Sequence, residues 1–258
     1  MKERLGKWKQ FTMFSGHPLL SKYIPETKKY TIENLIEMLD RHEHIYLKND
    51  RGGQGKGIFK VTKSKEGLYR FNGYTMKGEK VKMDVAKIKD FEPVLHPITR
   101  FGGYIVQEGV NSTTLDGFPL AIRVHVQILK DKWLIGGMYG KVAKDETTEN
   151  GIIKTSHSPQ LMMVETLLSD HLKMKKTEID YMIKSIQEIS VKAAEISAES
   201  VPEIEYGVDF GIKDFKELIL FEINTSPGVS NFSKIDNKEM RERIKAIRAA
   251  HLKGQKKT

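Results

Sequence analysis

The spacing of apolar and polar residues predicts short strands joined by hairpins, with helices between them. Apolar residues at helical spacing predict a helix over residues 31–44, with Thr31 as its N-cap, and a long helical block over residues 158–200. Alternating apolar and polar residues predict a β-meander over residues 58–83, and we interpret residues 45–50, 102–110, 120–129, 132–143, 206–214 and 217–228 as further strands. Such an irregular order of helices and strands indicates an α+β fold and not a doubly wound parallel sheet.

The two ends of the chain differ in character. Residues 1–29 combine an apolar, aromatic stretch with the segment KYIPET, which we interpret as a loop leading into the first helix. Residues 233–258 place Met240, Ile244, Ile247 and Leu252 at roughly helical spacing, and they hold nine Lys or Arg against three Asp or Glu. We favour a solvated, partly docked terminal helix here, with a contact to an anionic partner as the alternative.

Composition narrows the class of protein. The 258 residues are 39% hydrophobic and 30% charged, which is enough apolar material for a sizeable core in one two-lobed domain. Six of the nine net positive charges lie in the terminal segment, so the remainder is nearly balanced and we expect no nucleic-acid partner. The absence of cysteine excludes disulfides and thiolate chemistry. The chain has neither a long apolar run nor a secretory leader, so we expect a cytoplasmic protein without membrane contact.

A glycine-rich segment, Arg51 to Gly57, follows the strand that carries Lys48. Glycines let backbone N–H groups turn toward an anion, so such loops often surround phosphates. Three familiar phosphate loops do not fit. Gly57 stands where a P-loop needs Ser or Thr, Ile58 and Lys60 stand where a kinase loop needs glycine, and no helix follows as in a dinucleotide fingerprint. On these residues alone, a plain turn and a cover over phosphates are equally open.

An acidic hairpin forms the second candidate site. Glu222 and Asn224 are two apart on a predicted strand and therefore share a face, and a return through residues 213–214 can bring Asp209 opposite them. Three oxygen donors at one place suit Mg²⁺. Carboxylates on an outward strand face are the alternative, but the apolar run around Glu222 indicates a buried strand, where a carboxylate needs a partner. We favour the metal interpretation.

The order of these features resembles the ATP-grasp superfamily, and more closely its YheC/YheD-type, endospore-coat-associated group. The matching segments are IPET, IYLKNDRGGQGKGIFKV, YIVQEGV, IRVHVQ and YGVDFGI with LFEINTSPG, which span about residues 7 to 232. The resemblance implies an ATP-grasp fold, in which two α+β lobes hold ATP between their sheets. We place the boundary between the lobes at residues 106 and 107, giving an N-terminal lobe of residues 1–106 and a C-terminal lobe of residues 107–258.

The resemblance also implies residues that bind ATP. Lys7 and Lys48 would contact the α- and β-phosphates. A hinge would meet the adenine, and its Glu108 would accept a hydrogen bond from the adenine or the ribose. The loop over the phosphates would consist of Gly52, Gly53, Gln54, Gly55, Lys56 and Gly57, and the hinge would include Gln107, Glu108 and Val110.

A second group of residues would serve the reaction. By resemblance, Asp209, Glu222 and Asn224 would hold Mg²⁺, and Arg123 would neutralise charge on the transferred phosphoryl group. Lys141 stands where the family tends to carry a second arginine in the cleft. Lysine keeps the positive charge but lacks the planar guanidinium group that binds a carboxylate through two hydrogen bonds. The implied activity is a ligase that joins a carboxylate to an amine through an acyl phosphate. Such a site needs cations and positioning more than a protein nucleophile.

Three departures from the family pattern support an alternative function. Asn49 replaces a common proline, Ala121 replaces a common aspartate, and residues 150–154 replace a glycine-rich loop. These positions lie where the carboxylate and the amine should bind. The alternative is an ATP-binding scaffold or spore-coat-associated protein without turnover.

Overall fold

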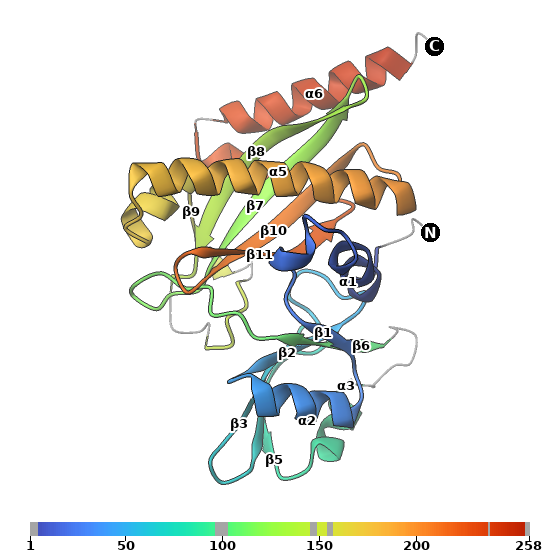
Figure 1. Ribbon diagram of the computed structural model, residues 1–258, viewed down its shortest axis with the longest axis vertical. Helices are drawn as coiled ribbons and strands as arrows, with labels where there is room; N and C mark the ends of the chain where they lie inside the picture. The colour runs from blue at the N-terminus through green and yellow to red at the C-terminus, as the bar shows by residue number, and fades with distance from the viewer. Residues whose placement is uncertain (1–4, 96–102, 145–148, 154–156, 237, 256–258) are drawn as a thin grey trace.

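Two antiparallel sheets organise the chain, one above the other in Figure 1. The computed structural model describes residues 5–95, 103–144, 149–153, 157–236 and 238–255. The first sheet has six strands in the order β1-β6-β2-β3-β4-β5, and the second has five in the order β11-β10-β7-β8-β9. The predicted α+β fold is therefore confirmed.

The first sheet comprises β1 (Thr27–Lys29), β2 (Ile45–Asn49), β3 (Ile58–Lys63), β4 (Tyr69–Tyr74), β5 (Lys80–Val85) and β6 (Tyr104–Glu108). One face carries apolar side chains such as Leu47 and Phe59, and it packs against α2 (Ile32–Arg41), η2 (Ile88–Phe91) and α3 (Glu92–Leu95). The alternate residues of β2, among them Tyr46 and Lys48, point to the other face, which looks toward the second sheet. The predicted meander is confirmed, as is the Thr31 cap, whose side chain accepts the Asn34 N–H at 3.1 Å.

The second sheet comprises β7 (Leu120–Leu129), β8 (Lys132–Val142), β9 (Gln160–Met162), β10 (Glu205–Lys213) and β11 (Glu217–Asn224). Its apolar face packs against the long helix α5 (Lys176–Ser200), which crosses it in Figure 1. The opposite face of β7 has two parts. Ala121 and Arg123 lie toward the first sheet, whereas His125 and Gln127 lie under the terminal helix α6 (Glu239–Gln255).

The terminal helix is docked, as the sequence predicted. Its Ile244 is fully buried with Tyr139 of β8 and with Phe232 of η7 (Ser230–Lys234). Gln127 donates a hydrogen bond to the Ile244 carbonyl at 3.0 Å, and Arg248 forms an ion pair with Glu205 at 2.7 Å. Among the described helices, none is long and apolar enough to cross a membrane.

One prediction of secondary structure was wrong, and one helix was not predicted. The N-terminal stretch forms a helix, α1 (Lys7–Ser15), followed by the short η1 (Ser21–Tyr23), and its Phe14 packs into the core of the second sheet. The predicted helical block over 158–200 begins with strand β9, because residues 160–162 pair with β8. The short helix α4 (Val164–Thr166) and a π-helical turn, η6 (Leu167–His171), precede α5. The division into lobes 1–106 and 107–258 stays a prediction.

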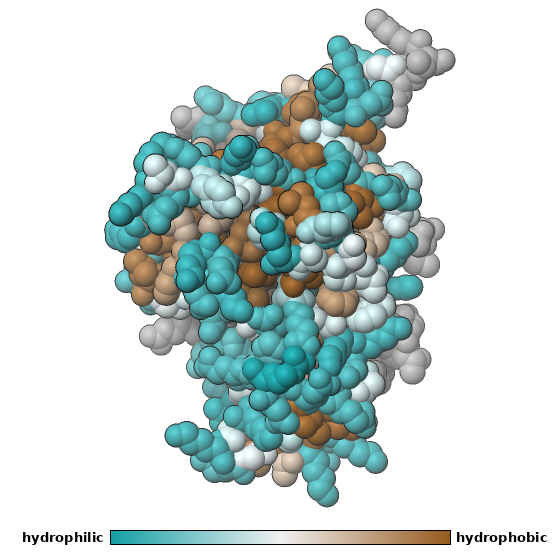
Figure 2. Space-filling view, viewed as in Figure 1, coloured by the Kyte–Doolittle hydropathy of each residue, from teal (hydrophilic) through white to brown (hydrophobic). Residues whose placement is uncertain are grey.

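The parts of the molecule around the two sheets differ in the hydropathy of their surface. On the face in Figure 2, hydrophilic side chains cover most of the lower part, which holds the first sheet, and apolar side chains show between the helices above it.

Candidate nucleotide and metal site

A cavity of about 630 Å³ opens between the two sheets. Both sheets contribute to its walls, and so do α1 and the loop that follows β6. The predicted site residues that line it are Lys7, Lys48, Gly55, Gln107, Glu108, Val110, Lys141, Asp209 and Glu222. Seven predicted site residues do not line the cavity. Arg123 and Asn224 are two of them, and both form hydrogen bonds with Asp209, which does line it. The other five are the loop residues Gly52, Gly53, Gln54, Lys56 and Gly57.

Two lysines from different elements meet at one end of the cavity. Lys7, at the start of α1, donates a hydrogen bond to the Gly52 carbonyl at 2.6 Å and lies 3.6 Å from Glu222 Oε2. Lys48, on β2, donates to Gln107 Oε1 at 2.5 Å. Burial lowers the pKa of Lys48, Glu222 raises it and Lys7 lowers it, and together these effects bring the pKa to about 8. This end of the cavity therefore concentrates positive charge with little solvent around it.

The glycine-rich loop is shaped by its backbone. Gln54, Gly55 and Gly57 have φ angles of 57°, 73° and 65°. A Cβ on Gly57 would lie 2.4 Å from the Met76 sulfur and in a left-handed backbone, so only glycine fits. The Gly57 carbonyl accepts the Asn49 N–H at 2.7 Å, which holds the end of the loop beside β2.

The acidic hairpin has the predicted register. Asp209 on β10 pairs directly with Glu222 on β11, so the two carboxylates share a face of the sheet. The Asn224 side-chain amide donates to Asp209 at 3.1 Å and to Glu222 at 3.3 Å, so the three predicted metal ligands lie together. The described residues hold no group of three or more His, Cys, Asp or Glu side chains arranged so that it could hold a metal ion, so any cation here would rely on two carboxylates and one amide.

Two cations surround the buried Asp209. Arg123 donates Nε and Nη2 to its two oxygens at 2.8 and 2.6 Å, and Lys141 lies 3.5 Å away. Burial alone would raise the pKa of Asp209, but Arg123 and Lys141 outweigh burial and hold that pKa below its ordinary value. Asp209 raises the pKa of Arg123 in turn, against the effect of burial. Both groups therefore stay charged.

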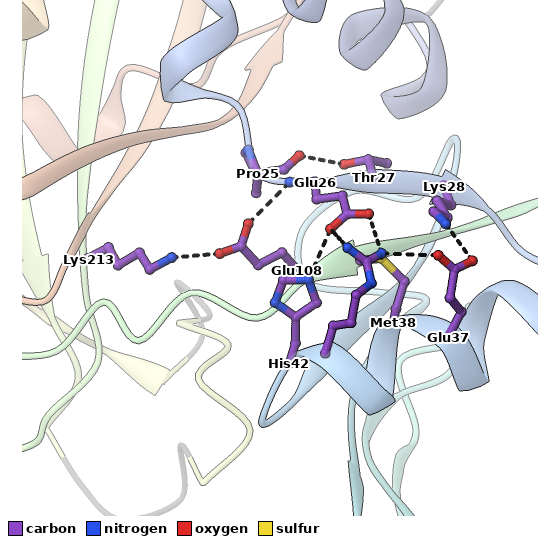
Figure 3. A network of polar contacts seen from close by, with 10 residues as sticks. Pro25, Glu26, Thr27, Lys28, Glu37, Met38, His42, Glu108 and Lys213 are labelled. Atoms are coloured by element: carbon purple, nitrogen blue, oxygen red, sulfur yellow. Dashed lines mark hydrogen bonds and ion pairs between the residues drawn. The ribbon is translucent and has the colours of Figure 1, made fainter.

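The predicted hinge lies within a polar network that Figure 3 shows. Glu108 accepts from Lys213 at 2.7 Å and from the Glu26 backbone N–H at 3.3 Å. The Glu26 carboxylate is in turn held by Arg41 at 2.5 Å. Burial raises the pKa of Glu108, but the contact with Lys213 outweighs burial and leaves the pKa below its ordinary value. Lys213 ends β10, so this pair joins the two sheets.

The sequence did not point to several other cavity residues, among them His44, Tyr46, Lys60 and Phe221. The alternation of side chains along the strands could have identified three of these residues. His44 and Tyr46 alternate with Lys48, and Lys60 pairs across the sheet with Tyr46, so all share one face. Burial lowers the pKa of His44 to about 4, which keeps it neutral.

The positions that depart from the family pattern lie at or near the cavity. Ala121 lines it, and the Asn49 side chain is buried and accepts the Arg51 N–H at 3.1 Å. The Asn150 carbonyl accepts from the Tyr46 hydroxyl at 2.8 Å, which ties residues 149–153 to the first sheet. Lys154 lies outside the described residues.

The fold defines the class of protein. The ATP-grasp ligase PsnB, solved in complex with a minimal precursor, superposes with a TM-score of 0.52 over 95% of this chain and 61% of its own, at 14% identity. The D-alanyl-alanine synthetase A of Vibrio cholerae O1 biovar eltor str. N16961 gives a TM-score of 0.49 over 87% of this chain and 56% of its own, at 15% identity. The architecture is that of ATP-grasp ligases.

The family follows from the sequence. The model of the YheC/D like ATP-grasp family matches residues 2–250, so the chain belongs to that family, and the predicted resemblance is confirmed. The endospore coat-associated protein YheD of Bacillus subtilis (strain 168) is 23% identical over 235 residues, which cover 88% of this chain and 49% of that protein. The chain thus spans about half the length of this curated relative.

Proposed function

We propose that the protein is an ATP- and Mg²⁺-dependent ligase that joins a carboxylate to an amine through an acyl phosphate. One observation carries the proposal. Two lysines from the first sheet and α1, and the carboxylates of Asp209 and Glu222 from the second sheet, line the same cavity. Cations and oxygen donors that line one cavity suit a triphosphate with its metal.

The nucleotide would occupy the length of the cavity. Lys7 and Lys48 would contact its phosphates, and Gly55 of the glycine-rich loop borders the same space. Apolar side chains of Ile58, Val110 and Phe221 also line the cavity and suit the flat faces of a base. Glu108 would accept a hydrogen bond from the adenine or the ribose, with Lys213 keeping it ionised.

The acidic hairpin would hold the metal. Bound Mg²⁺ would offset the charge of the phosphates as the phosphoryl group moves. The donor set fits a hard cation, since Asn224 lies within hydrogen-bond distance of both Asp209 and Glu222. Asn224 turns its amino group toward both carboxylates, so a rotation of the amide is needed before its oxygen can face a cation.

The remaining cations would act on the acceptor. Arg123 and Lys141 flank Asp209, and Lys141 faces the cavity. A substrate carboxylate and a triphosphate repel each other, and fixed cations reduce that repulsion. Both side chains are fixed by Asp209, so they need little reorganisation when charge develops. No nucleophile is required of the protein, because the substrate carboxylate would attack the γ-phosphorus and displace ADP, and the amine would then attack the acyl carbon, displace phosphate and lose a proton.

Calorimetry with ATP, with and without Mg²⁺, tests the site directly. We expect ATP to bind and Mg²⁺ to tighten binding, and the absence of magnesium-dependent binding would end the proposal. An ADP-release assay with panels of amino acids and short peptides tests turnover. Tight binding of Mg²⁺ and ATP without ADP release from any carboxylate and amine pair would favour the ATP-binding scaffold instead.

A further inference from the structure

Helix α1 touches both halves of the molecule. It contacts β1 of the first sheet, β11 of the second sheet and α5. Figure 1 shows it beside β11 and next to the β1 and β6 end of the first sheet. Lys7, the first residue of this helix, is the lysine that faces the glycine-rich loop and Glu222. The contacts that fix α1 therefore decide where the Lys7 ammonium group lies.

The start of α1 is capped by a residue from another element. Gly6 occupies the N-cap position and has no side chain to cap the helix. Asp50, which follows β2, accepts the Trp8 N–H on Oδ1 at 2.7 Å, and its carbonyl accepts the Lys7 N–H at 3.0 Å. A Cβ on Gly6 would lie 2.4 Å from Asp50 Oδ2, so glycine is what leaves room for this carboxylate. Asp50 thus provides the N-cap from 42 residues away.

The middle of α1 is fixed to the other sheet. Gln10 is buried, accepts the Ile223 N–H at 2.9 Å and donates to the Ile223 carbonyl at 3.1 Å. Its side-chain amide thereby pairs with the free edge of β11 as a neighbouring strand would. Ile223 is the residue between Glu222 and Asn224. One helix is consequently bound to the end of β2 and to the strand of the acidic hairpin.

We propose that Asp50 is a positioning residue for the nucleotide phosphates, which acts by holding the first turn of α1, and with it Lys7, against the glycine-rich loop and Glu222. The proposal rests on the proposed function, because it needs a phosphate group at Lys7. Asp50 is not among the residues that line the cavity, and its carboxylate is directed at the helix N-terminus. Capping fixes the peptide groups on both sides of Lys7, so the long side chain starts from a defined point.

Ligand binding to the full chain separates positioning from a simple effect of charge. Titrations with ATP and with adenosine are made on the wild type, Asp50→Ala, Asp50→Asn and the control Asp84→Ala. Asp84 is exposed on β5, where it pairs with Arg70 of β4, and β5 is the edge of the first sheet opposite β1. Removal of a negative charge near the phosphates would by itself tighten ATP binding. Loss of positioning should instead weaken it.

We expect Asp50→Ala to weaken ATP binding about tenfold while adenosine binding changes by less than about twofold. Asp50→Asn keeps a capping oxygen and should recover most of the ATP affinity, and Asp84→Ala should bind as the wild type does. Equal or tighter ATP binding by Asp50→Ala would overturn the proposal, as would an equal loss for adenosine or an Asn variant as weak as the Ala variant. A wild-type chain that binds no ATP would overturn the proposed function, and this inference with it. Hydrogen exchange of the Trp8 backbone amide tests the cap without any ligand. If Asp50 caps the helix, this amide must exchange faster in Asp50→Ala than in the wild type.

Discussion

Arg123 and Asp209 form a two-point ion pair in which Nε and Nη2 of the arginine each donate to one carboxylate oxygen, at 2.8 and 2.6 Å. The pair joins neighbouring strands, since Arg123 on β7 lies directly opposite Asp209 on β10. Asp209 is also the central member of the proposed metal site. The same carboxylate therefore stabilises two buried cations in the protein without ligands and would be shared with Mg²⁺ in the loaded protein.

Replacement of Asp209 should destabilise the fold. Asp209→Ala leaves Arg123 and Lys141 buried with their nearest anion removed, which should lower the free energy of unfolding by about 3 kcal/mol. Glu222→Ala removes a side chain that is 28% exposed and should cost less than about 1 kcal/mol. Urea unfolding of both variants measures the difference. Equal losses would show that the ion pair around Asp209 does not stabilise the fold.

Replacement of Glu222 should instead be visible in magnesium binding. Glu222→Gln keeps the size of the side chain but removes one of two carboxylates from the proposed metal set, so Mg²⁺ should no longer tighten ATP binding by the roughly tenfold or more we expect of the wild type. Calorimetry in excess Mg²⁺ and in chelator gives the two affinities. Glu149→Gln is the matched control, because Glu149 also lines the cavity but pairs with Lys82. A Glu222→Gln variant with a full magnesium effect would remove Glu222 from the metal site.

Short-range patterns were sufficient to predict most of the fold. Strands β2 to β5, β7 and β10 alternate apolar and polar residues, β11 is an apolar run, and helix α2 has Thr31 at its N-cap, so each of these elements is visible within about ten residues. Helix α1 was missed because Gly6 gives no capping signal and the capping residue, Asp50, comes 42 positions later. Strand β9 was missed because only three residues pair, and they do so with β8.

Short-range patterns also predicted part of the candidate site, but not the contacts between distant strands. Residue types and spacing indicated Lys48, Asp209, Glu222 and Asn224, and the register of the hairpin is as predicted. Their partners could not be predicted, because each contact depends on how two distant strands approach. Arg123 meets Asp209 across 86 positions, and Lys213 meets Glu108 across 105.

The terminal helix should contribute to stability through one face. Ile244 is fully buried beneath β7 and β8, so Ile244→Ala should lower the free energy of unfolding by about 2 to 4 kcal/mol through lost burial and the cavity left behind. Leu252, on the same helix, is 46% exposed, and Leu252→Ala should change stability by less than about 0.5 kcal/mol. Thermal or urea unfolding compares the two. If both substitutions are neutral, the helix is not docked in solution.

ATP binding should take up a proton in alkaline solution. Burial lowers the pKa of Lys48 to about 8 from 10.5, so the free protein loses this charge as the pH rises through 8. A bound phosphate favours the ammonium form and raises the pKa again. Below pH 7 Lys48 is already charged and binding should exchange no proton at this group, whereas near pH 9 binding should take up as much as about one proton and ATP affinity should fall as the pH increases.

Calorimetry in two buffers of different ionisation enthalpy measures the number of protons directly. Near pH 9 the phosphates of ATP are fully ionised, so any proton taken up on binding is bound by a group of the protein. Lys48→Met removes the titrating group and should abolish the uptake while weakening ATP binding, and Lys60→Met, from the same face of the sheet, is the control that keeps Lys48. If Lys48→Met takes up as many protons as the wild type, another group titrates, and the assignment of Lys48 to the phosphates loses its support.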